Sequence, residues 1–271
     1  MRLSSGEIVG VEALLRWRHP TRGIVAPADF IPAAENIGAI HPIGRWALNA
    51  ACHQAAAWKR AYAVPADFSV TVNVSVCQLR REDLVADVID ALASSGLAPE
   101  HLALEMTEGV LSEDTESTLG LLQRIHALGV RLAIDDFGTG SSPLTKLQRF
   151  PFDTLKIDRA FLKSLASPDA DDELVRMLVA LGHSLRMVTV AEAIEHPDQL
   201  LALREMGCEL GQGFLLAQPG SAGQIAARLA DSLGERDPAG AAVHAAPSRS
   251  ANGRPLLGVR RIDVTHRPAR R

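Results

Sequence analysis

The stretch RLAIDDFGTG, residues 131–140, decides the fold class of this chain. Its first four residues have the character of a strand, with three apolar residues after Arg131, and two acids, Asp135 and Asp136, follow directly. Upstream, residues 115–128 have the apolar spacing of an amphipathic helix that ends before Gly129, a residue type favoured at helix ends. Downstream, residues 154–157 form a second strand-like segment. Strands that alternate with helices in this way indicate a parallel sheet.

The same alternation extends in both directions from this stretch. Strands are predicted at residues 8–15, 68–74, 101–106, 131–134, 154–157 and 187–191, with a weak one at 213–216. Helices are predicted at residues 42–60, 83–94, 115–128, 171–185 and 197–206. A chain of 271 residues with this pattern has the length of a single α/β barrel.

Composition excludes several classes of protein. Apolar residues make up 47% of the chain and its formal net charge is −4, so no basic field exists for polymeric nucleic acid or for contact with an anionic membrane. The absence of a long apolar run and of a signal-peptide pattern leads us to expect a cytoplasmic location. The three cysteines, Cys52, Cys77 and Cys208, are far apart and predict neither a disulfide framework nor a zinc site.

Composition changes near residue 234. The segment 235–271 is rich in Ala, Pro, Arg and Ser and has almost no periodic apolar pattern. We therefore expect a folded domain over residues 1–234 and a disordered basic tail over residues 235–271 that is dispensable for chemistry.

Polar side chains occur in or at the carboxyl end of almost every predicted strand. Because these ends meet on one face of a parallel α/β fold, residues spread over the whole chain are expected to converge there. The set is Glu12, Asn73, Glu105, Asp135, Asp136, Lys156, Asp158 and Glu192, with Gln212 just before the last weak strand.

Each of these residues has an ordinary structural explanation. Glu12 could lie on an edge strand, Asn73 could cap a turn, and Asp135 with Asp136 could form a turn. Taken together, polar residues at the ends of almost all the predicted strands are hard to explain by packing alone. Clustered carboxylates repel one another, and divalent cations relieve that repulsion without protonation. A ligand set of oxygens alone suits Mg²⁺ or Mn²⁺, and two such ions can assist in-line attack on a phosphodiester.

The sequence resembles the EAL domain family. Glu12-Ala13-Leu14 stands in GVEALLRWRHP, and seven further blocks follow in the order and at the spacing of that family. The blocks are FIPAAENIGAIHPIGRWALNAAC, VNVS, LEMTEG, IDDFGTG, FDTLKIDRAF, AEAIE and GCELGQGF, and the resemblance covers about residues 6–230.

The resemblance implies a TIM-like (β/α)8 barrel with one irregular strand, usually dimeric. It also implies a cyclic-guanylate-specific phosphodiesterase that uses two Mg²⁺ or Mn²⁺ ions to convert the second messenger cyclic di-GMP to linear pGpG. The alternative is a receptor domain that binds cyclic di-GMP with weak or no turnover.

The resemblance also implies a role for each site residue. Glu12, Asn73, Glu105 and Asp135 match metal ligands, and Asp136, Asp158 and Glu192 match residues at or beside the second metal. Lys156 matches the lysine that orients the attacking water, Gln212 matches a glutamine near it, and Glu192 also matches a residue assigned as general base. Arg16 matches a substrate-phosphate contact, and Glu108 and Glu195 match residues that support the site, Glu108 by holding the loop after Asp136.

Three departures from the family pattern stand out. The family's first strand is expected upstream of Gly6, where this sequence has only MRLSS, so we expect a barrel that lacks its first strand. The loop after Gly140 contains Ser141 and Pro143 where the family has a different pattern. Ala193 replaces a glycine after Glu192, which would cost about 1 kcal/mol if that position has a positive φ.

Overall fold

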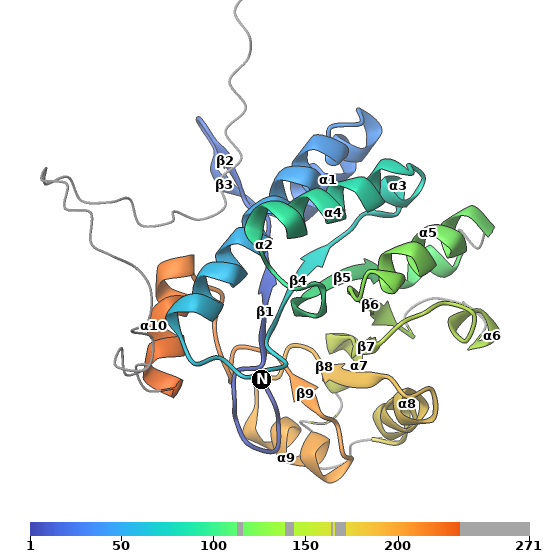
Figure 1. Ribbon diagram of the computed structural model, residues 1–271. Helices are drawn as coiled ribbons and strands as arrows, with labels where there is room; N and C mark the ends of the chain where they lie inside the picture. Colours follow the sequence, from blue (N-terminus) through green and yellow to red (C-terminus); the bar gives the residue numbers. More distant parts are fainter. Residues whose placement is uncertain (113–115, 139–143, 164, 166–171, 234–271) are drawn as a thin grey trace, which may run out of the picture.

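The central element of the fold is a curved sheet of seven parallel strands. The computed structural model describes residues 1–112, 116–138, 144–163, 165 and 172–233. The sheet has the order β1-β4-β5-β6-β7-β8-β9 (Figure 1). Its strands are β1 (Gly10–Ala13), β4 (Ser69–Asn73), β5 (Leu102–Thr107), β6 (Arg131–Phe137), β7 (Thr154–Ile157), β8 (Val188–Ala191) and β9 (Leu210–Gly211). This parallel order confirms the predicted α/β barrel class, with seven strands in its sheet.

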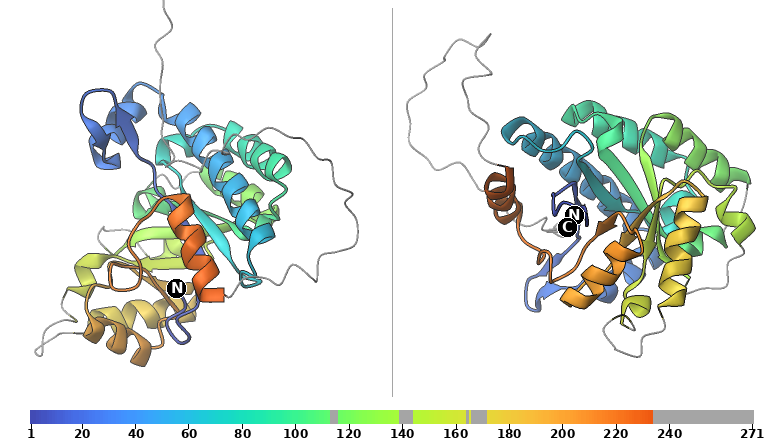
Figure 2. Two further views of the ribbon diagram at one scale, coloured as in Figure 1. Left: turned by 90° about the vertical axis from the view of Figure 1, so that its left-hand side faces the viewer. Right: turned by 90° about the horizontal axis from the view of Figure 1, so that it is seen from below.

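Helices cover the outer face of the sheet, as the view from below in Figure 2 shows. The longer ones are α1 (Pro27–Asn36), α2 (Ile40–Ala61), α4 (Asp83–Ser95), α5 (Glu116–Ala127), α8 (Glu173–Ser184), α9 (Pro197–Glu205) and α10 (Ala222–Leu233). The short ones are α3 (Val76–Leu79), α6 (Leu144–Leu147) and α7 (Arg159–Leu162), with the 3₁₀ turns η1 (Pro99–His101) and η2 (Glu108–Leu111). Strand residues that face outward, such as Val72, Leu104 and Ile134, are buried against these helices and form the main core.

The N-terminal segment lies at the edge of the sheet beside β9. Arg2 forms an antiparallel bridge with Leu210, and Leu3 N donates to the carbonyl of Glu209 at 2.9 Å. Met1 exchanges backbone hydrogen bonds with Gly211. The chain then turns back towards β1, so the first residues pair antiparallel with the last strand of an otherwise parallel sheet.

No separate helix or strand was predicted from the sequence in the segment between β1 and α2, here called the excursion. It contains a hairpin of β2 (Trp17–His19) and β3 (Gly23–Val25), followed by α1. Trp17 makes edge-to-face ring contacts with His19 and Phe30, which hold the hairpin on α1. Strands of three residues are too short to give a periodic signal, and this explains the omission.

The weak strand expected at residues 213–216 was wrong. The last strand is β9, and Gln212 follows it instead of preceding a strand. Gly213 has φ +157°, and a Cβ there would lie 2.2 Å from the backbone nitrogen of Ile194. The chain turns sharply beside the β8 loop at this point, which needs the absence of a side chain.

Two segments for which the sequence makes predictions lie outside the described residues. They are the tail over 235–271 and the loop containing Ser141 and Pro143. The three cysteines are free thiols. Among the helices that the structure describes, none combines the length and the apolar character needed to cross a membrane.

Ala193, which replaces a glycine of the family pattern, has a left-handed backbone conformation with φ +53°. An alanine in this conformation costs about 1–2 kcal/mol, whereas glycine costs little there but adds entropy to the unfolded chain. We expect Ala193→Gly to raise the free energy of unfolding by about 0.5–1 kcal/mol. Chemical denaturation measures this change. Ala202→Gly, in helix α9, is the control and should lower stability by about 1 kcal/mol; a loss at both positions would contradict the strain at Ala193.

Candidate active site

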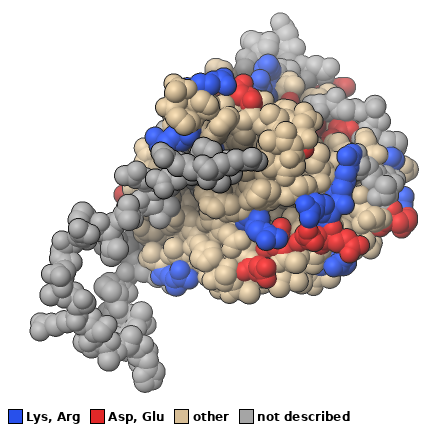
Figure 3. Space-filling model, turned by 90° about the horizontal axis from the view of Figure 1, so that it is seen from above, with Lys and Arg blue, Asp and Glu red and all other residues tan. Residues whose placement is uncertain are grey.

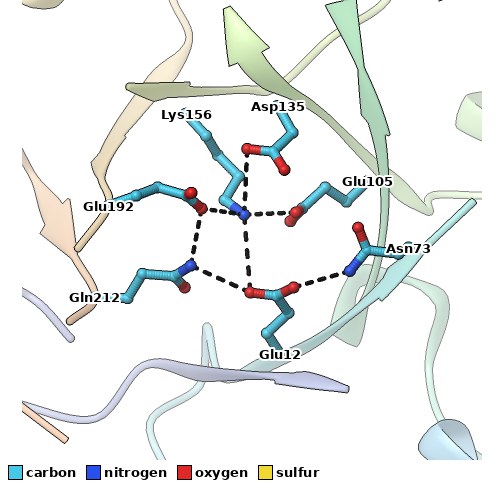
Figure 4. A network of polar contacts seen from close by, with 7 residues as sticks. All are labelled: Glu12, Asn73, Glu105, Asp135, Lys156, Glu192 and Gln212. Atoms are coloured by element: carbon cyan, nitrogen blue, oxygen red, sulfur yellow. Dashed lines mark hydrogen bonds and ion pairs between the residues drawn. The ribbon is translucent and has the colours of Figure 1, made fainter. Parts of the chain in front are cut away.

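Seven polar side chains converge at the carboxyl ends of the strands, in the interior of the curved sheet (Figure 4). They come from five strands and from the residues directly after β8 and β9, which is why they are far apart in the sequence. The seven residues are Glu12, Asn73, Glu105, Asp135, Lys156, Glu192 and Gln212. Their convergence is what the positions at the strand ends predicted.

Lys156 lies at the centre of the carboxylates. Its ammonium group is 2.5 Å from Glu105 Oε1, 3.6 Å from Asp135 Oδ1 and 3.8 Å from Glu12 Oε2, and it forms a very short ion pair with Glu192. Lys156 and Glu105 are almost fully buried, with 4% and 1% of their surface exposed. One buried cation thus faces four acidic side chains, which leaves the site with excess negative charge.

Two amides cross-link the acids. Asn73 Nδ2 donates to Glu12 Oε1 at 2.8 Å, from the neighbouring strand. Gln212 Nε2 donates to Glu12 Oε2 at 3.1 Å and to Glu192 Oε1 at 2.8 Å. Glu12 and Glu192 are therefore held in fixed positions relative to each other although 180 residues separate them in the sequence.

A local irregularity brings Asp135 and Asp136 to the same site. Adjacent residues of a regular strand face opposite sides of a sheet. Here the register between β6 and β7 shifts between Ile134 and Phe137, and Asp136 has a left-handed backbone with φ +54°. Such irregularities redirect side chains next to functional sites, and this one keeps both carboxylates near Glu192.

Two further predicted residues, Asp158 and Glu108, lie at the border of this cluster. Asp158 caps α7 by accepting from Ala160 N at 2.8 Å, and its side chain is near enough to Asp136 to help raise the pKa of that carboxyl group. Glu108 Oε2 accepts from Gly138 N at 3.0 Å, which connects η2 to the residues after Asp136.

Two predicted residues are not drawn into the cluster by any described contact. The guanidinium of Arg16 donates to the carbonyl of Leu15 at 2.7 Å. Glu195 is exposed, and its backbone nitrogen donates to Gln199 Oε1 at 2.8 Å. Gln199 Oε1 also accepts a hydrogen bond from His196 N, and Gln199 Nε2 donates one to the carbonyl of Leu162. These hydrogen bonds fix the loop that follows Glu192.

The sequence analysis assigned no role to Gln199 or to the turn after β4. Ser75 and Gln78 form a capping box at the start of α3. A serine followed three residues later by glutamine is a recognisable signal for such a box, so this feature could have been found. Gln199 is the N3 residue of a capping box at the start of α9, but the N-cap there is His196, which is not one of the usual cap residues, so the sequence signal is weaker.

Burial and mutual repulsion shift the acid–base equilibria of the cluster. Burial raises the pKa of Glu105 to about 9 and that of Glu192 to about 7, against the opposing effect of Lys156. Burial and the neighbouring Asp135 and Asp158 raise the pKa of Asp136 to about 6. Burial alone would lower the pKa of Lys156, but the surrounding carboxylates raise it above its ordinary value. The lysine is therefore charged, and the acids share at least one proton near neutral pH.

These shifts make stability depend on pH when no metal is bound. A carboxyl group whose folded pKa is raised favours the folded state below its unfolded pKa, 4.5 for Glu105, and that contribution is lost as pH rises towards 9. We expect the free energy of unfolding in EDTA to fall between about pH 5.5 and about pH 8.5, by up to about 1.4 kcal/mol per pH unit. Thermal melts across this range measure it. Glu105→Gln should flatten the dependence; an unchanged slope would show that other groups cause it.

The donor set fits divalent cations. Carboxylate oxygens of Glu12, Glu105 and Glu192 lie within 4.8 Å of one another, and so do those of Asp135, Asp136 and Glu192. Asp135 Oδ1 is buried and has no hydrogen-bond partner, because the Lys156 ammonium at 3.6 Å is too far away to donate one. Glu192 belongs to both groups, so two adjacent ions sharing this carboxylate are compatible with the geometry. Oxygen ligands alone favour Mg²⁺ or Mn²⁺ over softer metals.

The face of the molecule drawn in Figure 3 shows no dominant charge. On the face drawn in Figure 3, basic and acidic side chains lie next to one another and leave wide neutral areas between them. This distribution agrees with the formal net charge of −4. A ligand with a few negative charges would be recognised by local groups, without a broad electrostatic field.

Comparison with known proteins identifies relatives over most of the chain. The family model described as EAL domain matches residues 1–219. An uncharacterized signaling protein of Caulobacter vibrioides is 44% identical over 218 residues, which are 80% of this chain and 26% of that protein. The bifunctional diguanylate cyclase/cyclic di-GMP phosphodiesterase MucR of Pseudomonas aeruginosa is 43% identical over 226 residues, 83% of this chain and 33% of MucR. The chain thus spans between a quarter and a third of these relatives' lengths.

Solved structures resemble this fold closely. The phosphodiesterase PaMucR in complex with c-di-GMP has a TM-score of 0.75 and 43% identity, covering 80% of this chain and 87% of that chain. The EAL enzyme Bd1971, bound to cAMP and cyclic-di-GMP, has a TM-score of 0.79 and 32% identity, covering 84% of this chain and 62% of that chain.

Proposed function

This chain belongs to the EAL domain family, and from that premise we propose that it hydrolyses cyclic di-GMP to linear pGpG with the help of two Mg²⁺ or Mn²⁺ ions. The observation that carries the proposal is the intact acidic cluster. Seven of the predicted site residues occupy one connected network, and each carboxylate in it has a position in a two-ion donor set. The related MucR is named as a cyclic di-GMP phosphodiesterase, which supports the choice of substrate.

The proposed reaction is the addition of water to one phosphodiester. The water oxygen attacks phosphorus, the P–O3′ bond breaks, and the leaving oxygen takes up a proton, which opens the ring. Divalent cations held by Glu12, Asn73, Glu105, Asp135, Asp136, Asp158 and Glu192 would polarise the phosphodiester and neutralise its developing charge.

The protein's own residues would position the reactants and move the proton. Glu192, whose pKa is raised to about 7, is suited to accept a proton from the attacking water at neutral pH. Lys156 lies beside it and can donate a hydrogen bond to that water, while Gln212 holds Glu192 in place. Arg16 lies four residues after Glu12 and is proposed to contact the substrate phosphate when its guanidinium leaves the Leu15 carbonyl.

The further properties inferred from the family belong to the same proposal. We propose that the chain acts in the cytoplasm, forms a homodimer, and has its catalytic domain within residues 1–234. The alternative, a receptor that binds cyclic di-GMP without turnover, would use the same site. Formation of linear product separates the two.

We expect turnover of cyclic di-GMP in Mn²⁺ or Mg²⁺, none in excess EDTA, and recovery when the metal is restored, because the negative charge of the site would otherwise repel the substrate. Chromatography of guanine nucleotides measures this. Full turnover in EDTA would exclude the two-ion mechanism, and binding without product in all conditions would favour the receptor.

A further inference from the structure

The end of helix α1 is attached to the turn that follows strand β4. The hydroxyl of Ser75 donates a very short hydrogen bond to Glu35 Oε1. The same hydroxyl oxygen accepts from Cys77 N at 3.1 Å as the N-cap of α3. The hydroxyl of Ser75 therefore donates its proton to a residue of α1, and its oxygen accepts a hydrogen bond within its own turn. A hydrogen bond from a hydroxyl to a carboxylate is charge-assisted and stronger than one between neutral groups.

A second helix supports the same turn from another side. Ser75 N donates to Gln78 Oε1 at 3.1 Å, and Gln78 is buried, with 7% of its surface exposed. Gly44 of α2 provides the space for it, since a Cβ there would lie 2.1 Å from Gln78 Nε2. The turn after β4 is thus fixed by α1 through Glu35 and packed against α2 through Gln78.

This turn begins at a residue of the acidic cluster. Asn73 is the last residue of β4, two positions before Ser75, and it donates to Glu12 at 2.8 Å. Val74 N, between them, donates to the carbonyl of Glu105 at 2.7 Å. A shift of Ser75 would therefore move the backbone that carries Asn73.

The excursion between β1 and α2 closes into a ring at these contacts. The chain leaves the site just after Glu12, passes Arg16 and the β2–β3 hairpin, and returns through α1 to Glu35. Glu35 contacts Ser75, and Asn73 contacts Glu12, so two hydrogen bonds close the ring at the site. In Figure 1, α1 and α3 lie at the same end of the molecule.

We infer that Glu35 is a positioning residue that holds Asn73 against Glu12 and thereby sets the affinity of this part of the site for a divalent cation. The inference rests on the proposed function, because it takes Asn73 and Glu12 as ligands of that cation. Glu35 itself touches neither the cation nor the substrate in this account. Its effect passes through Ser75 and the backbone of residues 73–75.

The test compares Glu35→Ala, Glu35→Gln, Ser75→Ala and the double variant Glu35→Ala/Ser75→Ala. The first readout is the Mn²⁺ dissociation constant without substrate, from the electron paramagnetic resonance signal of free Mn²⁺. The others are the melting temperature in EDTA and kcat at saturating Mn²⁺. The control is Gln224→Ala, which removes a hydrogen-bonded cap at the start of α10.

We expect Glu35→Ala and Ser75→Ala each to weaken Mn²⁺ binding about 10-fold, the size of effect typical of residues that support metal ligands. The double variant should bind Mn²⁺ about as Ser75→Ala does, because Ser75→Ala already removes the hydrogen bond to Glu35 together with the cap of α3. Glu35→Gln keeps an acceptor for Ser75 and should bind Mn²⁺ almost as the wild type does. The kcat at saturating Mn²⁺ should change much less than the dissociation constant, and Gln224→Ala should change neither.

Wild-type Mn²⁺ affinity in Glu35→Ala, or additive losses in the double variant, would overturn the inference. So would a lower melting temperature with unchanged affinity, which would make the contact a structural tether only. Ser75→Ala removes the hydrogen bond from the other side and carries the test if Glu35→Ala does not fold. If the wild type neither binds Mn²⁺ nor hydrolyses cyclic di-GMP, the proposed function fails and the inference fails with it; an active wild type beside an unaffected Glu35→Ala overturns the inference alone.

Discussion

Glu12→Ala is expected to lower turnover of cyclic di-GMP about 10³-fold, equivalent to about 4 kcal/mol of transition-state stabilisation. Glu12 lies where Asn73, Gln212 and Lys156 meet, at 2.8, 3.1 and 3.8 Å. Its removal takes one carboxylate from the donor set and frees the two amides that hold that set in order. Mn²⁺ affinity should fall together with turnover, and both are measured on the same purified protein.

The fold should survive this substitution. Without metal, the loss of one carboxylate reduces repulsion among the acids, so the melting temperature in EDTA should not fall. Glu205→Ala, on the exposed side of α9, is the matched control and should leave turnover unchanged. Near-normal rates for Glu12→Ala at low Mn²⁺ would show that Glu12 is not a ligand.

Lys156→Ala is expected to have a different effect, a loss of both turnover and metal-free stability. The lysine is the buried cation that faces four acids, and its removal leaves their charge uncompensated. Breaking a buried ion pair from one side costs about 3–5 kcal/mol. Turnover should also fall by at least about 100-fold, because the attacking water loses a hydrogen-bond donor.

Added Mn²⁺ separates the two roles of Lys156. The ion should restore more stability to Lys156→Ala than to the wild type, since it supplies the missing positive charge, but it should not restore turnover. Lysine is not a metal ligand, so Mn²⁺ binding should be retained better than in Glu12→Ala. Lys156→Met keeps the apolar stem and controls for packing. Equal melting temperatures of wild type and Lys156→Ala in EDTA would contradict the central place of this cation.

The parallel sheet and its site were largely predictable from local sequence. Strand and helix periodicity gave the order of elements, and the position of Glu105 or Lys156 within an apolar strand indicated which face it occupies. The convergence of these residues followed from a general property of parallel sheets. Their charge balance then indicated hard divalent cations.

The remaining features depend on contacts that no local pattern encodes. The reach of Asp135 and Asp136 to one site requires a register shift in β6, and the last strand ends at Gly211 because Gly213 must pass beside Ile194. The β2–β3 hairpin has strands of three residues, which are too short for a periodic signal. The link between Glu35 and Ser75 joins elements 40 residues apart and became visible only in the folded chain.

The central claim is that this chain opens cyclic di-GMP at the acidic cluster, and product analysis tests it most directly. Purified protein is incubated with cyclic di-GMP and Mn²⁺, beside parallel samples with EDTA and with Glu12→Ala, and the nucleotides are separated by chromatography. We predict linear pGpG from the wild type in Mn²⁺ and almost none in the two parallel samples. Unchanged cyclic di-GMP in the wild-type sample, with the protein folded and Mn²⁺ bound, would contradict the account.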